Sequence, residues 1–161
     1  MNAIDLLKSQ HRKVADLFAK IEKAKSSKQK EELFVEIADS LAIHASIEEH
    51  HFYPAVKAKT TENILLESVE EHLGIKRVLS DLLEVEVNDE TFDAKLKVLK
   101  DLVEHHVEEE EKDLFPKVAK AVDKADLEEI AEAMSDEQAD LEDKGNARET
   151  VPSETAKAAT I

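Results

Sequence analysis

Apolar residues recur along this chain at steps of three and four, the spacing that lines one face of an α-helix. The pattern predicts four long amphipathic helices, which cover roughly residues 3–24, 28–59, 61–83 and 92–114. Only short polar connections separate them, and short connections make consecutive helices antiparallel neighbours. The sequence therefore predicts an all-α fold, an up-down-up-down antiparallel four-helix bundle.

Beyond the fourth helix the pattern changes twice. Residues 123–144 are strongly acidic and keep enough helical spacing to form a fifth, C-terminal helix. Residues 145–161 are small and polar, include Pro152, and are typical of a disordered tail. We therefore divide the chain into a bundle over residues 1–122, an extra acidic helix over 123–144 and a tail over 145–161.

Composition narrows the chemistry. The 161 residues include no Cys, which excludes disulfides, thiolate nucleophiles and cysteine-bound iron–sulfur clusters, so any metal must be held by nitrogen and oxygen. The formal net charge of -16 argues against nucleic acid and against an anionic membrane surface as partners. No segment resembles a signal peptide or a membrane-spanning helix, so we expect a cytoplasmic protein.

One stretch of sequence occurs twice. Residues 44–54 read HASIEEHHFYP, and residues 106–116 read HVEEEEKDLFP. In each copy a His is followed four residues later by a Glu, and a Pro closes the motif. Residues four apart on a helix lie on the same face, with Cβ atoms about 5–6 Å apart. Each copy therefore presents one imidazole and one carboxylate side by side.

Each predicted helix carries one His on its apolar stripe, and two of the helices add a Glu. Burying these groups without partners would cost on the order of several kcal/mol each, so something must compensate them. Imidazole with carboxylate suits iron, manganese or zinc, and two Glu side chains can bridge a metal pair about 3.5–4 Å apart. The predicted metal ligands are His11, His44, Glu48, His72, His106 and Glu110.

Several residues beside this set have two possible roles each. His105 offers a shifted pairing with the second Glu, although only its neighbour keeps the spacing of the repeat. We expect Glu49 and Glu111 to be solvated, with a role behind the metal ligands as the alternative. Lys76 is expected to turn its ammonium outward. Tyr53 is expected to pack at a helix end, or else to donate a proton or electron to a nearby metal.

These motifs resemble the hemerythrin family, in particular its HHE (His-His-Glu) cation-binding domains, over about residues 3–120. The resemblance rests on the ordered set SQHRK, HASIEEHHFYP, EEHLGIK and HVEEEEKDLFP, each on its own helix. It implies a non-haem di-iron centre, two iron ions bridged by carboxylates, although another divalent metal would also suit these ligands. It further implies binding of dioxygen, or in some members reaction with nitric oxide or peroxide.

The chain departs from the oxygen-carrying members at one position. Those proteins place two His one turn apart on the third helix, whereas here the second position holds Lys76. Fewer protein ligands leave more open positions on the metal, which favours reaction with small oxidants over reversible oxygen carriage. The alternative is iron storage, donation or iron-centre repair at the same site, and whether the protein is an enzyme stays open. A ferritin-like site is disfavoured because only one Glu-x-x-His motif, at residues 48–51, lies on a ligand-bearing helix.

Overall fold

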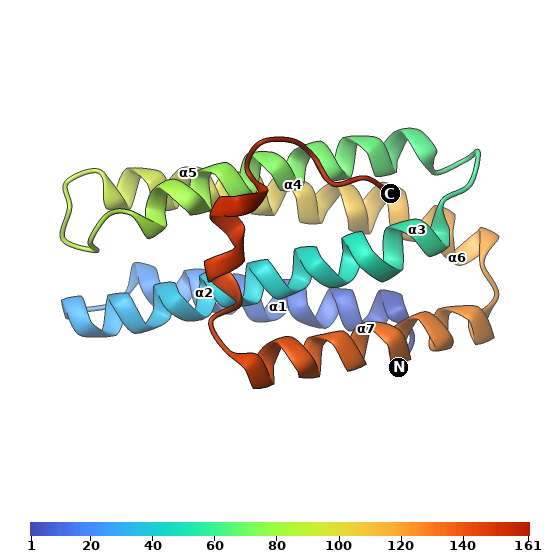
Figure 1. Cartoon of the computed structure of the whole chain (residues 1–161), viewed down its shortest axis with the longest axis horizontal. Helices are drawn as coiled ribbons and strands as arrows, with labels where there is room; N and C mark the ends of the chain where they lie inside the picture. The colour runs from blue at the N-terminus through green and yellow to red at the C-terminus, as the bar shows by residue number, and fades with distance from the viewer.

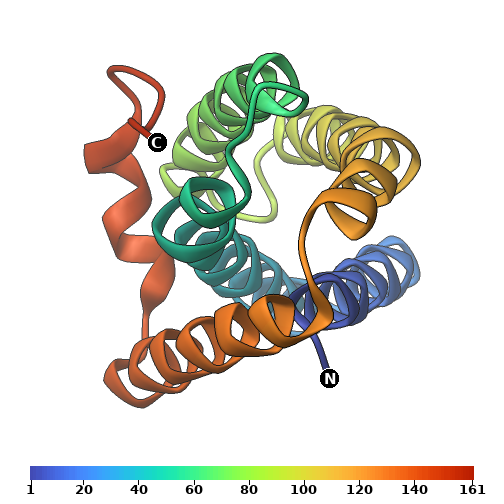
Figure 2. The same cartoon turned by 90° about the vertical axis from the view of Figure 1, so that its right-hand side faces the viewer.

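The computed structural model describes all of residues 1–161 and contains helices but no strands. Its four long helices are α1 (Ala3–Glu22), α2 (Ser27–Ile47), α4 (Glu62–Leu83) and α5 (Phe92–Glu109). Consecutive helices run antiparallel, with α1 beside α2 and α4 beside α5 (Figure 1, Figure 2). The predicted four-helix bundle is confirmed.

Two of these helices change pitch directly after the repeated motif. A π-helical turn, η1 (Glu48–Phe52), leads into the short helix α3 (Tyr53–Val56), and η2 (Glu110–Leu114) leads into α6 (Phe115–Ala121). Pro54 and Pro116 fall in the first turn of the short helices, where a missing N–H costs little. Each π turn therefore adds a residue at the ligand-bearing end of its helix, a feature common at functional sites.

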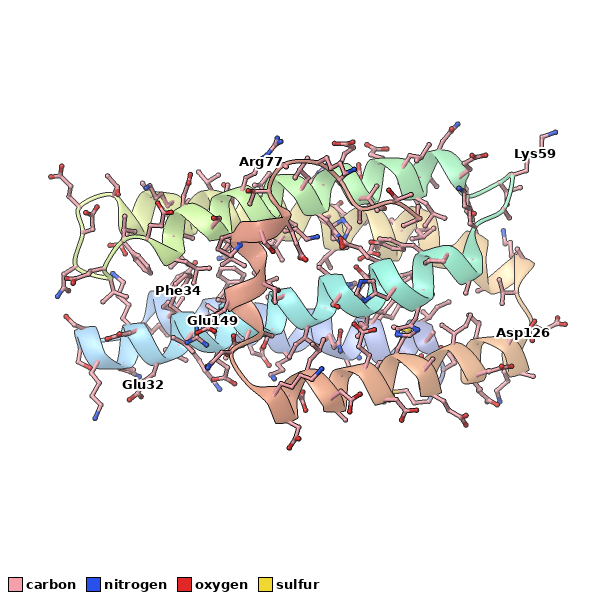
Figure 3. All side chains as sticks on the ribbon, viewed as in Figure 1. Glu32, Phe34, Lys59, Arg77, Asp126 and Glu149 are labelled. Carbon is pink, nitrogen blue, oxygen red and sulfur yellow. The ribbon has the colours of Figure 1, made fainter.

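The apolar core consists of two clusters along the bundle axis. In α1, Leu7 belongs to one cluster and Val14 to the other, and the inward His lies between them. The inward His of α2 and that of α4 likewise lie between the two clusters, and that of α5 lies between Val103 of one cluster and Leu114 of the other, which follows in η2. At the end of the bundle away from His11, Phe34 (labelled in Figure 3) meets Phe92 edge to face at 5.3 Å. The polar side chains thus form one layer between two dry regions.

The acidic segment after the bundle forms the expected fifth helix, α7 (Lys124–Lys144), which packs against α1 and α2 (Figure 2). It ends at Gly145, whose φ of 72° lies in the left-handed region that glycine adopts without strain. Asn146 follows with a φ of 56°, and together these two residues turn the chain back toward the bundle. None of the helices is both long and apolar enough to span a bilayer.

The C-terminal residues differ from the predicted disordered tail. Residues Ala147–Glu154 form a 3-10 helix, η3, that lies across α2 and α4 (Figure 1). Val151 is 1% exposed and joins the core, and Arg148 makes an ion pair with Asp39 of α2 at 3.0 Å. Arg77, labelled in Figure 3, donates to the backbone oxygen of Thr155. Two buried apolar side chains, Ala147 and Val151, and two arginines thus hold a segment whose composition alone is typical of disorder.

Candidate metal centre

The six side chains predicted to hold metal meet in the polar layer of the bundle. Each is at most 8% exposed, and Glu48 and Glu110 are fully buried. They come from the middle of α1 and α4, from the last turn of α2 and α5, and from the first residues of the two π turns. The structure brings all six together, while the role of each as a ligand stays a prediction.

One half of the centre is formed by His11 and His44 with one oxygen of each Glu. His44 Nε2 lies 3.2 Å from Glu48 Oε1, and His11 Nε2 lies 3.3 Å from Glu110 Oε1. These four buried atoms have no hydrogen-bond partner, and all lie within 4.8 Å of one another. Four unpartnered donors around one point are an arrangement that a metal ion satisfies. We call this set the first half-site.

The second half-site is formed by His72 and His106. His72 Nε2 lies 3.0 Å from Glu48 Oε2, and His106 Nε2 lies 3.1 Å from Glu110 Oε1. The two ring nitrogens face each other at 3.0 Å, so two neutral imidazoles with their lone pairs turned inward would need a cation between them. Both half-sites share Glu48, so its carboxylate can bridge two metal ions.

Each imidazole is held from behind by a hydrogen bond to its outer nitrogen. The Nδ1 atom of His44 meets Gln10 at 2.6 Å, and that of His11 meets Glu111 at 2.9 Å. In the second half-site the partners are carboxylates of Glu49, 2.8 Å from His72, and Glu71, 3.0 Å from His106. Such partners turn the free Nε2 lone pair toward the centre and fix the ring orientation of a metal-binding His.

This geometry agrees with the comparisons to known proteins. The family model of the hemerythrin HHE cation-binding domain matches residues 2–118. The chain belongs to this family. A crystal structure of a hemerythrin HHE cation-binding domain-containing protein from Mycobacterium kansasii matches with a TM-score of 0.81 and 27% identity, over 96% of this chain and 94% of that one. The resemblance stated from the sequence motifs is confirmed, and the His/Glu cluster of this HHE domain could hold metal.

A curated relative is far longer than this chain. A DNA nickase from Nostoc sp. is 27% identical over 97 residues, which are 60% of this chain and 28% of that protein. The chain therefore spans well under half the length of the relative it matches.

Tyr53 lies inside the second half-site rather than packing only at a helix end. Its phenol oxygen is 3.0 Å from Glu48 Oε2 and 3.0 Å from Glu110 Oε2. The same oxygen lies 3.2 Å from His72 Nε2 and 3.4 Å from His106 Nε2. The π turn explains this position, because the Tyr53 N–H donates to the carbonyl oxygen of Glu48, five residues back. This wider turn places the phenol beside the Glu48 carboxylate. Regular helical spacing in the sequence could not reveal this position of Tyr53.

The centre has a strong demand for positive charge. Burial alone would lower the pKa of His106, but the carboxylates of Glu110, Glu48 and Glu71 together outweigh it and raise that pKa well above 6.5. Burial also lowers the pKa of His11 and of His72, but nearby carboxylates outweigh it and raise both pKa values. Burial would raise the pKa of Glu48, but the charge of His44 and bonds from other imidazoles hold it well below the usual range. The buried carboxylates therefore favour positive charge at this layer, which a metal ion would supply.

Two expectations about neighbouring residues are corrected. Lys76 does not turn outward, because its ammonium is buried and donates to both oxygens of Glu49, at 2.8 and 3.0 Å. Glu49 is only 7% exposed and accepts from His72, so it is held behind the second half-site rather than solvated. Glu111 also bonds an inward imidazole, although its side chain remains 36% exposed.

The other three histidines lie outside the inner set. His50 and His51 contact Glu137 of α7, which also accepts from Ser46. His105 is largely exposed and lies 3.2 Å from both Glu71 and Glu109. The shifted pairing that would use His105 in place of its neighbour is therefore absent from the centre.

Proposed function

We propose that this HHE domain is a non-haem di-iron protein that binds or reacts with small oxidants, namely dioxygen, nitric oxide or peroxide. One observation carries the proposal. Four buried donor atoms of the first half-site lack partners, and two ring nitrogens of the second half-site face each other across 3.0 Å. Such groups are costly when buried alone and favourable when they bind a cation.

The donor set fits iron. Each half-site offers two imidazole nitrogens and shares carboxylate oxygens with the other, a combination that suits iron and manganese and also accepts zinc. His11 and His44 would hold one ion, His72 and His106 the other, and Glu48 and Glu110 would bridge. Tyr53 is a candidate for a further oxygen ligand, because its phenol oxygen lies within 3.4 Å of both ring nitrogens of the second half-site and 3.0 Å from the Oε2 atoms of both carboxylates.

An iron pair, when bound, would supply Lewis acidity and electrons for a small oxidant. The chain itself supplies the setting. The bridging carboxylates keep the two half-sites at a fixed separation, and the outer hydrogen bonds keep the four Nε2 atoms turned inward. The apolar clusters on both sides of the layer exclude water, which strengthens every electrostatic interaction within it.

Burial favours oxidant chemistry over iron storage or donation. The two carboxylates are fully buried, and the cavity that reaches the imidazoles measures about 30 Å³. A water molecule needs roughly 10–15 Å³ by the same measure, so this space suits a ligand of two or three atoms. An acceptor protein could not reach iron held in such a place without opening the bundle.

The DNA-cutting activity named for the Nostoc relative finds no support in the charge of this chain. The net charge of -16 repels a phosphate backbone, and the relative is matched over only 28% of its length. We therefore assign the proposed chemistry to the buried centre alone.

Metal analysis and optical spectroscopy test the proposal. Protein purified from iron-replete cells is expected to hold about two irons per chain and to show visible charge-transfer bands that change on addition of peroxide, nitric oxide or dioxygen. His44→Ala and Glu110→Ala are each expected to lose about two irons per chain, because the half-sites share bridging carboxylates.

A surface histidine gives the matched control. His105→Ala changes a residue next to a proposed ligand but outside the centre, so it should keep its iron and its spectrum. Unchanged iron in His44→Ala and Glu110→Ala would contradict the ligand assignment. Labile iron that passes to an acceptor apoprotein, without any spectral response to oxidants, would favour the storage and donation alternative.

A further inference from the structure

Lys76 is the only Lys or Arg buried in the core of this protein. Burying an ammonium is expensive unless a counter-charge accompanies it, so its surroundings need an explanation. It lies on α4 one turn after His72, and its ammonium donates two hydrogen bonds to Glu49, at 2.8 and 3.0 Å. A second carboxylate, that of Glu154 on η3, lies 3.5 Å away and is partly exposed.

The same lysine lies in the wall of the cavity that adjoins the metal centre. That cavity is lined mainly by apolar side chains, and all four inward imidazoles reach it. Lys76 and Glu154 belong to its lining, and Val151 of η3 contributes to it as well. A ligand small enough for this space would therefore meet the inner histidines and this ammonium together.

The charge of this wall depends on the buried ion pair of Lys76 with Glu49, because the second carboxylate, that of Glu154, is 44% exposed and is screened by solvent. Glu49 is held against His72 whether or not Lys76 is present, because the imidazole donates to it at 2.8 Å. With Lys76 the pair is neutral overall. Without it, the buried carboxylate of Glu49 would leave an uncompensated negative charge close to the cavity, where the surroundings are too dry to screen it.

We propose that Lys76 is a specificity-determining residue, which neutralises Glu49 so that the cavity accepts small anions. This inference rests on the proposed di-iron function and adds to it the class of ligand. Neutral ligands of the same size are bound without regard to the charge of the wall. The lysine thus decides between ligands that geometry alone would not separate.

Azide and nitric oxide are the probes that test this role, since one is a small anion and the other is neutral. Both are titrated against the iron-loaded protein and followed by their visible spectra. In Lys76→Met the affinity for azide should fall by about tenfold or more, since a charge in a medium of effective dielectric about 20 has that effect at close range. The affinity for nitric oxide should stay within about twofold of the unaltered protein.

Two further variants separate charge from structure. Lys76→Arg keeps the positive charge and should keep most of the affinity for azide. Lys76→Met combined with Glu49→Gln removes both charges, while the amide oxygen of Gln can still accept from His72. This double variant should regain most of the azide affinity lost in Lys76→Met, a recovery that a merely structural role for the lysine would not produce.

The outcomes distinguish this inference from the function on which it rests. If the unaltered protein holds no iron, or shows no spectral response to either probe, the di-iron function is overturned and the inference with it. If the unaltered protein responds but Lys76→Met weakens azide and nitric oxide equally, or the double variant recovers nothing, the role of Lys76 alone is overturned. Iron content and thermal unfolding, measured on every variant, show which of them keep the fold and the centre.

Discussion

The two half-sites are alike in their inner donors and different in what surrounds them. Each offers two imidazoles, and both draw on the same pair of carboxylates. At the equivalent position of the repeated motif, however, one copy has Tyr53 and the other has Phe115. Phe115 stacks on His11 with ring centroids 5.9 Å apart and donates nothing, whereas the phenol of Tyr53 reaches the donors of the second half-site.

The outer hydrogen bonds differ in the same sense. The first half-site is backed by the neutral amide of Gln10 and by the partly exposed Glu111. The second is backed by two carboxylates, of Glu49 and Glu71. An internal repeat therefore supplies two similar inner sets, and the residues that differ around them, Tyr53 against Phe115 and Glu71 against Gln10, make the two positions chemically distinct. We expect the second position to stabilise the more oxidised metal, because anionic partners raise the basicity of its imidazoles.

Removing what the half-sites share should have the largest effect. Glu48→Ala is expected to empty both positions, because this carboxylate faces His44 with one oxygen and His72 with the other. The loss of bound metal should lower the free energy of unfolding by roughly 4 kcal/mol, if the free metal concentration is about a thousand times the Kd of the unaltered protein. Metal analysis and thermal unfolding measure both effects.

Glu111→Ala is the matched control for this change, since Glu111 backs the first half-site alone. It should keep about two irons per chain, with an affinity lower by about tenfold. Retention of one iron in Glu48→Ala would mean that the half-sites bind metal independently and that the bridging carboxylate is not shared.

Exchanging the aromatic residues should have the next largest effect. Tyr53→Phe makes the second half-site resemble the first, and we expect the oxidised protein to lose a phenolate-to-iron absorption band and about tenfold in metal affinity. The double exchange, Tyr53→Phe with Phe115→Tyr, tests whether the band can be moved to the first half-site. An unchanged visible spectrum in Tyr53→Phe would remove the phenol from the set of ligands.

The contrast between the half-sites also marks how far the sequence could predict the site. The four-helix bundle and the six inward side chains followed from helical spacing, because His and Glu four residues apart must share a face. Tyr53 did not follow, since the π turn shifts it relative to regular helical spacing. A π turn arises from local hydrogen bonding near Pro54, which leaves no periodic signal in the sequence.

The neighbours of the ligands were missed for a different reason. Glu49 and Lys76 are charged residues, and charged residues on helices are solvated in most proteins. Here each is buried because the other neutralises it, a pairing between α4 and η1 that no local pattern reveals. The C-terminal residues were missed because the few apolar side chains of this segment show no helical period, and only packing against α2 and α4 explains why Val151 is buried.

Changing the outer partners should have a smaller effect, on redox potential rather than on metal content. Gln10→Glu gives the first half-site a carboxylate behind His44, and Glu71→Gln removes one from behind His106. The first change should lower the one-electron reduction potential by about 60 mV, and the second should raise it by about as much, which corresponds to a tenfold change in equilibrium. Spectroelectrochemical titration measures both, and shifts of the same sign would contradict the proposed electrostatic difference.

The smallest expected effect is a difference in pH dependence between iron-free and iron-loaded protein. The raised pKa values of His11, His72 and His106 stabilise the iron-free fold fully below about pH 6.5. That stabilisation is lost as pH rises through the pKa values that these groups have in the folded protein. The lowered pKa values of Glu48 and Glu110 contribute above about 4.5 and are lost as pH falls. Without iron, the centre should therefore add most to the free energy of unfolding between about pH 4.5 and 6.5. It should add less at pH 8, where Tm should be lower by a few degrees, at roughly 2–4 °C per kcal/mol.

With iron, stability should instead rise with pH, because metal binding requires deprotonated imidazoles and grows stronger as pH rises. Thermal unfolding of both forms from pH 5 to 8 measures the gap between them, and a gap that narrows with rising pH would contradict metal binding by these histidines.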